Sequence, residues 1–404
     1  MEHGIAYFQA LNEELKRYKN AVPRLLIDLD ALDCNIAELK RSVKEGVNFR
    51  IVVKSLPSPP LIQYLMEQIG TTKLMVFHQP FLTQLLPLLG QEADVLLGKP
   101  MPVQTLQYFY ENLPNGTSTF DPFTQIQWLV DSQDRLAQYQ AIAKEKSWKL
   151  NVNLEIDVGL HRGGFADLNS FESALVFLMQ NKDTLTLSGL MGYDPHVVKL
   201  PKVLRSKERA FQMVCTAYRG YIEILKDKFP SLWNDQLTLN GAGSPTIALH
   251  QSTLSPLNDW SAGSCLVKPT SFDIPSLESY CLASYIATPV LKKLEGTTIP
   301  AIERYKGILN ALDRNNKQSF FIYGGYWKAD YHYPFGLKAN QLFGESTNQS
   351  MVNAPEGCDL VVDDFVFLRP KQSEFVFLQF GKILTIRNQQ IVEEWEIFQN
   401  DADS

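Results

Sequence analysis

A lysine stands at the end of an apolar run near the N-terminus of the chain. In NFRIVVKSLPSPP, residues 48–60, Ile51, Val52 and Val53 lead to Lys54, and a proline-rich turn follows. Short runs of Val and Ile are typical of strands buried on both faces. A lysine at such a strand end usually reaches back to water with its ammonium group. It can also attack an aldehyde and hold it as a Schiff base, and this is the chemistry that Lys54 could do.

Other reactive side chains follow other short apolar runs, in segments where loops are expected. They are His78, Asp131, His161 and Arg162 in DVGLHRGGF, Tyr193 and His196 in GYDPH, residues 240–246 in NGAGSPT, and Ser264 in AGS. A single loop residue of this kind is usually just solvated. Their shared position after apolar runs indicates that the fold could bring them together.

Strand and helix patterns alternate about eight times between residues 24 and 270. The expected strands end at Val53, Phe77, Gly98, Val130, Asp157, Tyr193, Asn240 and Val267, with amphipathic segments such as 59–70, 134–148 and 209–229 between them. This order is typical of an α/β protein built as a (β/α)8 TIM barrel, in which the loops after the strands form the active site. A doubly wound sheet alternates in the same way and stays an alternative. No GxGxxG opens a helix after a strand, which disfavours a dinucleotide site.

The segment NGAGSPT, residues 240–246, is typical of an anion-binding loop. Its glycines and Ser244 follow an expected strand, and Pro245 suits the first turn of an expected helix. Free backbone amides, the helix dipole and the hydroxyls of Ser244 and Thr246 would favour a phosphate there. Barrels of this class commonly hold phosphate in a late loop. Taken alone, a plain strand-to-helix turn accounts for the segment equally well.

A Schiff-base lysine and a phosphate loop in one barrel point to a ligand that carries both an aldehyde and a phosphate. Pyridoxal phosphate (PLP) is such a ligand. A sugar-phosphate aldolase that needs no cofactor is the alternative, but it usually has its lysine on a later strand.

Composition excludes several other classes of protein. The formal net charge of −6 over 404 residues argues against binding to nucleic acid or to anionic membranes. No apolar run is long enough to span a membrane, and residues 1–20 lack the apolar core of a signal peptide. The 5 cysteines form no CxxC pair, which suits a reducing cytoplasm and argues against a cysteine zinc site. We therefore expect a cytoplasmic enzyme with a small-molecule substrate.

After about residue 275 the pattern changes to alternating, β-branched and aromatic segments. They predict a second, mostly antiparallel β domain over residues 276–404 together with residues 1–22, whereas the barrel is expected over 23–275. The RNQQ segment, residues 387–390, is typical of a hairpin turn.

Four motifs together resemble one enzyme family. RIVVKS, EIDVGLHRGGF, GLMGYDPH and NGAGSPT occur in the order and spacing of the D-threonine aldolase and D-serine dehydratase family. This family is the branch of the alanine-racemase-type PLP fold that combines a barrel with a β domain. DWSAGSCLV resembles the next strand of the family, and the resemblance covers nearly the whole chain from residue 23 to 398.

The resemblance implies roles for individual residues. Lys54 resembles the Schiff-base lysine that also carries the proton at the substrate α-carbon, and Arg162 resembles the arginine that faces the pyridine nitrogen. An arginine stays protonated and donates to that nitrogen, which makes the cofactor a weaker electron sink. Tyr193 is similar to the tyrosine beside the cofactor, and His161 and His196 fall in matching motifs as candidates for proton transfer. The remaining expected cofactor contacts are Asn240, Gly241, Gly243, Ser244, Thr246, Gly263 and Ser264.

The chain departs from the family where a metal is expected. Members that act on β-hydroxy-D-amino acids carry a histidine followed two residues later by cysteine or aspartate, after a strand and a proline. Here FLRPKQSEFVFL places Gln372 and Glu374 at those positions, and GESTNQS (344–350) replaces an upstream element that contains histidine. Glutamine is a poor ligand for zinc or manganese, although Glu374 could supply one oxygen. A bound divalent metal is therefore doubtful.

Three functions follow as hypotheses. The first is a PLP-dependent lyase of the aldolase or dehydratase type that acts on a D-amino acid; the second is an amino-acid racemase that needs no metal. The third is a protein that carries PLP without catalysis, which an intact second domain and a set of histidines disfavour. The resemblance also implies a homodimer. A second base could come from the segment 323–336 with Tyr326, His332 and Tyr333, although aromatic packing accounts for that segment slightly better.

Overall fold

The computed structural model describes residues 4–114, 119–199, 206–294, 318–341 and 343–400, which fall into two compact units. The barrel unit comprises Ile36–Cys265, Ile274–Leu277 and Phe398–Ser404. The sheet unit comprises Met1–Asn35, Leu266–Asp273 and Glu278–Ile397. This division differs from the expected boundaries mainly at the N-terminal side, because β1 (Arg24–Asp28) pairs with strands of the sheet unit.

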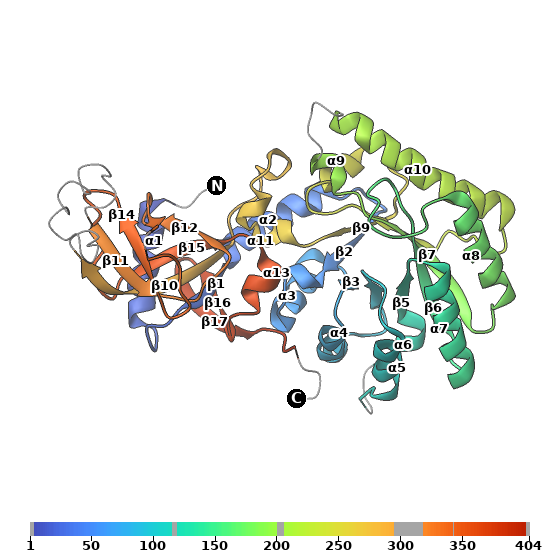
Figure 1. Cartoon of the computed structure of the whole chain (residues 1–404), viewed down its shortest axis with the longest axis horizontal. Coiled ribbons are helices and arrows are strands. Elements are labelled where there is room, and N and C mark those ends of the chain that lie inside the picture. The colour runs from blue at the N-terminus through green and yellow to red at the C-terminus, as the bar shows by residue number, and fades with distance from the viewer. Residues whose placement is uncertain (1–3, 115–118, 200–205, 295–317, 342, 401–404) are drawn as a thin grey trace. The chain divides into compact units, whose positions relative to one another are not determined.

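The barrel unit is built on a closed ring of parallel strands in the order β2 to β9 (Figure 1). The strands are β2 (Asn48–Val52), β3 (Lys73–Val76), β4 (Asp94–Leu97), β5 (Ile126–Val130), β6 (Leu150–Glu155), β7 (Leu185–Gly192), β8 (Thr238–Gly241) and β9 (Asp259–Ala262). Parallel pairing of β2 with β9 closes the ring. The predicted (β/α)8 barrel is thus confirmed, and the doubly wound sheet is excluded.

Helices connect the strands, and α7, α8 and α10 lie along the outside of the ring (Figure 1). Ser58, Ser132 and Ser206 accept N-cap hydrogen bonds at the starts of α3, α7 and α10. At α3 the prolines of the SPP segment fill the first helical turn, as expected. The helices are α2 (Leu29–Ser42), α3 (Pro59–Ile69), α4 (Gln79–Leu85), α5 (Val103–Glu111), α6 (Pro122–Gln125), α7 (Gln133–Lys146), α8 (Leu168–Gln180), α9 (His196–Lys199), α10 (Lys207–Lys228) and α11 (Ser264–Val267).

Two local predictions near the end of the barrel are wrong. The last strand is β9, residues 259–262, and the segment SCLV expected as that strand is the short helix α11. The sequence of β9, DWSA, is not an apolar run and so was not recognised as a strand. Its Asp259 points into the barrel, where it binds Arg50. The helix expected from Pro245 is a 3₁₀ turn, Ile247–Gln251, so no long helix adds its dipole to the preceding loop.

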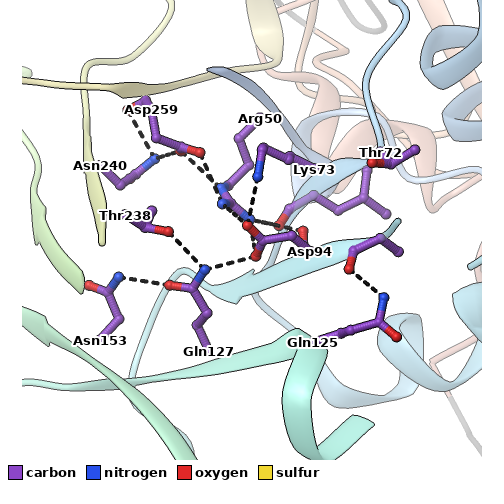
Figure 2. Close-up of polar contacts among 12 residues, drawn as sticks. Arg50, Thr72, Lys73, Asp94, Gln125, Gln127, Asn153, Thr238, Asn240 and Asp259 are labelled. Carbon is purple, nitrogen blue, oxygen red and sulfur yellow. Dashed lines mark hydrogen bonds and ion pairs between the residues drawn. The ribbon is translucent and has the colours of Figure 1, made fainter. Parts of the chain in front are cut away.

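Side chains inside the barrel form layers, because alternate residues of each strand point inward. Near the carboxyl ends of the strands the layer is apolar: Met75, Leu96, Leu129 and Met191 form a buried cluster against which Val52 and Phe77 pack. Two residues earlier on the same strands the inward positions are polar, among them Arg50, Lys73, Asp94 and Gln127 (Figure 2).

In the sheet unit, the described strands form a nine-stranded sheet, most of whose pairings are antiparallel. The main order is β13-β14-β11-β10-β1-β16-β17, and β15 joins β10 to β12. The strands after β1 are β10 (Ser284–Leu294), β11 (Gln318–Tyr323), β12 (Ala329–Tyr333), β13 (Lys338–Ala339), β14 (Gln349–Ala354), β15 (Phe365–Pro370), β16 (Lys382–Arg387) and β17 (Gln390–Glu396). The short helix α13 (Ser373–Phe377) follows β15.

Helix α1 (Ile5–Arg17) covers this sheet with an apolar stripe. Its buried residues Phe8, Leu11 and Leu15 recur at helical spacing and pack with strand residues such as Tyr285 and Phe367. The predicted hairpin at RNQQ is confirmed: Asn388 and Gln389 have φ values of 49° and 64° between β16 and β17. Among the described helices, none is long and apolar enough to cross a membrane.

Candidate active site at the carboxyl ends of the barrel strands

Lys54 lies where the sequence placed it, directly after the first strand of the barrel. It sits in the 3₁₀ turn Val53–Ser55 that follows β2, and its Nζ is 4.5 Å from the centroid of the Phe77 ring. Phe77 follows β3, and Gly98 follows β4 beneath the same ring. A Cβ at Gly98 would lie 2.2 Å from the Phe77 ring, so this glycine makes room for the aromatic side chain. The ring in turn offers its face to the Lys54 ammonium group.

The loop after β6 holds a histidine and a carboxylate in contact. Asp157 accepts hydrogen bonds from the backbone N–H groups of Gly159 and His161, and its other oxygen is 2.7 Å from His161 Nδ1. Burial alone would raise the pKa of Asp157, but these hydrogen bonds outweigh it and lower the pKa. The His161 ring is 83% exposed. His196 lies beside the same turn, because a Cβ at Gly159 would be 3.3 Å from its Nε2.

Arg162 and Tyr193 meet above the same end of the barrel. The Arg162 guanidinium lies 5.1 Å from the centroid of the Tyr193 ring. Tyr193 also borders residues 240–246, which we call the anion loop, because a Cβ at Gly243 would come within 3.0 Å of its ring. Glu155, at the end of β6, lies beside the turn that carries Arg162, and burial together with the charge of Asp131 raises the pKa of Glu155 against the opposing effect of Arg162.

The loops after β8, β9 and β2 are tied to one another by side-chain hydrogen bonds. Ser244 Oγ accepts from the N–H of Gly263 at 3.3 Å and from the N–H of Cys265 at 3.0 Å. Ser264 Oγ donates to Ser55 Oγ at 3.0 Å, and Ser55 is the neighbour of Lys54 in sequence. Lys54 and the anion loop therefore belong to one connected structure.

The anion loop also keeps backbone donors available. Among the described residues, no hydrogen-bond acceptor is found for the N–H groups of Gly243 and Ser244. Gly243 O accepts from the N–H groups of Thr246 and Ile247, both at 2.9 Å, which fixes the turn. Unpaired N–H groups in a tight turn are the usual donors to a phosphate. Free backbone N–H groups were expected at this turn together with a helix dipole; the N–H groups are present, and no long helix follows them.

A buried polar chain that the sequence analysis missed supports this loop. Thr246 Oγ1 donates to Asp194 at 2.8 Å, and the second oxygen of Asp194 is 2.9 Å from His250 Nε2. His250 Nδ1 is 2.8 Å from Ser255 Oγ. Thr246, Asp194 and His250 are at most 1% exposed. Asp194 stands in the GYDPH segment that drew attention to its neighbours Tyr193 and His196, and its place in that segment was the available signal.

Two residues expected to contact a cofactor, Asn240 and Gly241, instead make contacts within the barrel. Asn240 is 1% exposed and donates through Nδ2 to Asp259 Oδ1 at 2.5 Å and to Ser261 Oγ at 2.7 Å, inside the barrel. A Cβ at Gly241 would lie 2.8 Å from the carbonyl oxygen of Gly192, so this glycine lets β7 and β8 approach. Both residues lie at the end of β8 and position the anion loop that follows.

Comparison with known proteins identifies the barrel. The family model described as alanine racemase, N-terminal domain, matches residues 27–267. The chain belongs to this family. No curated protein matches the chain at the level of sequence.

Three solved structures show how far the fold is shared. D-threonine aldolase from Filomicrobium marinum is 14% identical, with a TM-score of 0.72 over 95% of this chain and 98% of that chain. D-threo-3-hydroxyaspartate dehydratase from Delftia sp. HT23 is 17% identical, with a TM-score of 0.68 over the same shares. Alanine racemase from Bacillus anthracis is 15% identical, with a TM-score of 0.69 over 94% of this chain and 98% of that chain. The predicted alanine-racemase-like fold with its two parts is confirmed.

The residues at the barrel mouth fit the PLP that the family implies. Lys54 offers a primary amine, and the free N–H groups of Gly243 and Ser244 offer an anion cradle. A Cβ at position 243 would lie 3.0 Å from the Tyr193 ring, so the glycine lets the loop pack closely against this tyrosine. Aldehyde and phosphate partners therefore occur in one alanine-racemase-type barrel.

The residues at the family's metal position do not fit a divalent cation. Gln372 precedes α13, and its Oε1 accepts a hydrogen bond from Lys328 Nζ at 2.9 Å. A lysine ammonium group beside the amide repels a second cation, and Glu374 would be left as a single carboxylate ligand. In the part of the chain that the structure describes, no group of three or more His, Cys, Asp or Glu side chains is arranged to hold a metal.

The aromatic segment of the sheet unit is mainly a packing element. The Tyr333 ring stacks on Phe8 with ring centroids 4.8 Å apart, and the centroids of the His332 and Phe8 rings are 5.4 Å apart. Tyr326 differs, being 64% exposed with a φ of 51°. Packing thus accounts for His332 and Tyr333, as the sequence analysis favoured.

Proposed function

We propose that the chain is a PLP-dependent enzyme that acts on a D-amino acid, as a lyase of the aldolase or dehydratase type. One observation carries the proposal: Lys54 and an open anion loop stand at the same end of a closed alanine-racemase-type barrel, joined through Ser55, Ser264 and Ser244. A lysine amine and a phosphate cradle in one site match the two functional groups of PLP.

When bound, the cofactor supplies an aldehyde for the amino group of the substrate and a ring that accepts electron density from its α-carbon. Lys54 would hold the cofactor and then move the proton at the α-carbon. The N–H groups of Gly243 and Ser244 would bind the phosphate. Arg162, which is always protonated, would meet the cofactor as a hydrogen-bond donor and keep its ring a weaker electron sink.

A second proton-transfer group is available in the loop after β6. Asp157 lies 2.7 Å from His161 Nδ1, and a carboxylate there favours the tautomer with the proton on Nδ1. Nε2 of His161 is then an acceptor on an exposed ring and can exchange a proton with a substrate or with water. His196, beside Gly159 of the same turn, is the alternative for the same role.

The lyase class is supported by the structural neighbours that are an aldolase and a dehydratase of D-3-hydroxy amino acids. A metal-independent amino-acid racemase is the second candidate, and the Lys328–Gln372 hydrogen bond favours it. Proton removal and return at the α-carbon needs no metal on a β-hydroxyl group, so a chain without that metal can still racemise.

The cofactor assignment is tested by the visible absorption of the purified chain with added PLP. We expect a yellow protein whose band disappears in Lys54→Ala and persists in Lys99→Ala, a matched change of an exposed lysine after β4. A colourless protein that does not respond to PLP would refute the proposal.

The reaction is tested by product analysis with D-threonine, D-serine and D-alanine. Glycine plus an aldehyde indicates an aldolase, and a keto acid plus ammonia indicates a dehydratase. The opposite enantiomer indicates a racemase, and a yellow protein without any of these products would contradict an amino-acid enzyme.

A further inference from the structure

A polar cavity of about 390 Å³ opens at the amino ends of the barrel strands. We call it the floor cavity. Its lining includes Lys73, Asp94, Gln127, Ser188, Asp235 and Thr238. Because the strands are parallel, this is the end of the barrel opposite to Lys54. Ligand sites of small molecules commonly have volumes of about 300–1,000 Å³.

Arg50 lies behind the inner wall of the floor cavity, where it is hydrogen-bonded to two carboxylates (Figure 2). Arg50, 0% exposed, binds both oxygens of Asp259 and both oxygens of Asp94 at 2.9–3.1 Å. Asp94 also accepts from Lys73 Nζ at 3.0 Å and from Gln127 Nε2 at 2.8 Å. Asp94 therefore has no oxygen left for a ligand, and the charges of this wall balance locally.

Three hydrogen-bond donors on the wall are left over. Among the described residues, Lys73 Nζ makes one hydrogen bond, to Asp94, although an ammonium group has three donors, and the Lys73 side chain is 28% exposed. Thr238 Oγ1 accepts from Gln127, and no described residue accepts its own hydrogen. Ser188 Oγ is buried without a partner among the described residues. Buried polar groups are nearly always paired, so the Ser188 and Thr238 hydroxyls call for an acceptor that the described residues do not provide, and the partly exposed Lys73 ammonium group can donate to the same acceptor.

Ser188 reaches the cavity because of a β-bulge. Val152 pairs with Leu187 and Asn153 with Gly189, which leaves Ser188 as the extra residue in β7. Gly189 is needed beside it, since a Cβ there would lie 2.0 Å from the carbonyl oxygen of Thr238. Bulges often redirect a side chain into a functional site. The local backbone thus places an unpaired hydroxyl next to the Lys73 and Thr238 donors.

Acceptors lie farther out on the lining. Asp235 is exposed and makes no ion pair with the described residues. Asn151 donates through Nδ2 to two backbone carbonyls, and no described residue donates to its Oδ1. A ligand with an acceptor group at one end and a donor group at the other fits this order. A dianion would be repelled by Asp94 and Asp235, and a bare metal ion would be repelled by Lys73.

We propose that the floor cavity binds a small zwitterionic carboxylate of amino-acid size. Its carboxylate contacts Lys73, Ser188 and Thr238, and its ammonium group faces Asp235 and Asn151. The site is separate from the barrel mouth and does not depend on PLP. Charge-assisted hydrogen bonds from the Lys73 ammonium group supply most of the affinity.

Isothermal titration calorimetry with glycine tests the site on the full chain, with and without PLP. We expect glycine to bind to the unchanged chain and to Lys54→Ala alike. Affinity falls at least about tenfold in Lys73→Met and falls less in Ser188→Ala, because the serine removes one neutral donor. Lys73→Arg keeps most of the affinity because it keeps the charge. Acetate, which lacks the ammonium group, binds more weakly than glycine.

Several results would overturn the proposal. Absence of glycine binding to the unchanged chain would show that water alone fills the cavity. Binding that disappears in Lys54→Ala and persists in Lys73→Met would place glycine at the mouth. Because Lys73→Met also removes an ion pair, Ser188→Ala is the second variant; unchanged glycine affinity in Ser188→Ala, checked for folding by circular dichroism, contradicts the proposed contacts.

Discussion

Replacing Thr246 by valine tests how the anion loop is held. Thr246 is 0% exposed, and its hydroxyl donates to the buried Asp194 at 2.8 Å. Valine keeps the shape and removes this one hydrogen bond. We expect the affinity for PLP to fall while the affinity for pyridoxal, which lacks the phosphate, stays the same.

The size of the effect follows from the contact that is lost. A hydrogen bond to a charged group contributes about 1.5–3 kcal/mol, and about 1.4 kcal/mol corresponds to a tenfold change in an equilibrium constant. Loss of this hydrogen bond lowers the fraction of chains whose anion loop is correctly formed. The apparent dissociation constant for PLP then rises by about 10- to 150-fold. The free energy of unfolding falls in the same range, because the Asp194 carboxylate keeps only His250 as a partner among the described residues.

The assay is titration of the chain with PLP and with pyridoxal, followed by visible absorption. Thr246→Ser, which keeps the hydroxyl, is the matched control and should restore most of the PLP affinity. Ser255→Ala removes the far end of the same polar chain and should have a smaller effect. Equal losses of affinity for PLP and pyridoxal in Thr246→Val, or no recovery in Thr246→Ser, would refute the reasoning.

The other predictions concern the barrel interior, the mouth and the metal. Arg50→Met should lower the free energy of unfolding by about 3–5 kcal/mol, measured by urea denaturation, because buried carboxylates lose their counter-charge. Burial would raise the pKa of Asp94, but Arg50 and Lys73 outweigh it and lower the pKa. The stabilisation by the Arg50–Asp94 pair is therefore complete above the pKa of about 4 that Asp94 has in the unfolded chain, and it is lost as pH falls. The difference in free energy of unfolding between the unchanged chain and Arg50→Met should narrow below about pH 4. Gly98→Ala should displace Phe77 and slow the appearance of the PLP band, and an unchanged rate would contradict the packing described. Extensive treatment with a chelator should leave activity unchanged, whereas activity restored by zinc or manganese would show that the Gln372 region does bind a metal.

The barrel and the position of Lys54 were predictable from sequence because the signals are local. Apolar runs of four to six residues between amphipathic segments mark most of the strands, and Lys54 directly follows such a run. The turn at residues 240–246 and its free backbone N–H groups were also predictable, since glycines and a serine directly after a strand are typical of such a turn. The contribution of a helix dipole was predicted wrongly, because the expected helix from Pro245 is a short 3₁₀ turn.

What could not be predicted depends on contacts between distant residues. The last barrel strand was missed because Asp259 makes it look polar, and only the pairing with Arg50 accounts for a carboxylate there. The strand Arg24–Asp28 belongs to the sheet unit through pairing with β10 and β16, far away in sequence. The contact between Asp194 and His250 likewise joins residues from two separate loops.

The layered interior makes the two ends of the barrel separable in experiments. The apolar cluster of Met75, Leu96, Leu129 and Met191 lies between the mouth that carries Lys54 and the polar network around Arg50. Charges in that network are balanced by direct hydrogen bonds, so the loss of one donor such as Lys73 changes the field at the mouth only weakly. An effect of a floor ligand on catalysis would therefore have to travel through movement of the strands. A Lys73 variant that loses glycine binding but keeps its PLP band and its substrate KM would show that the two sites are energetically independent, whereas a shifted KM would show that the strands couple them.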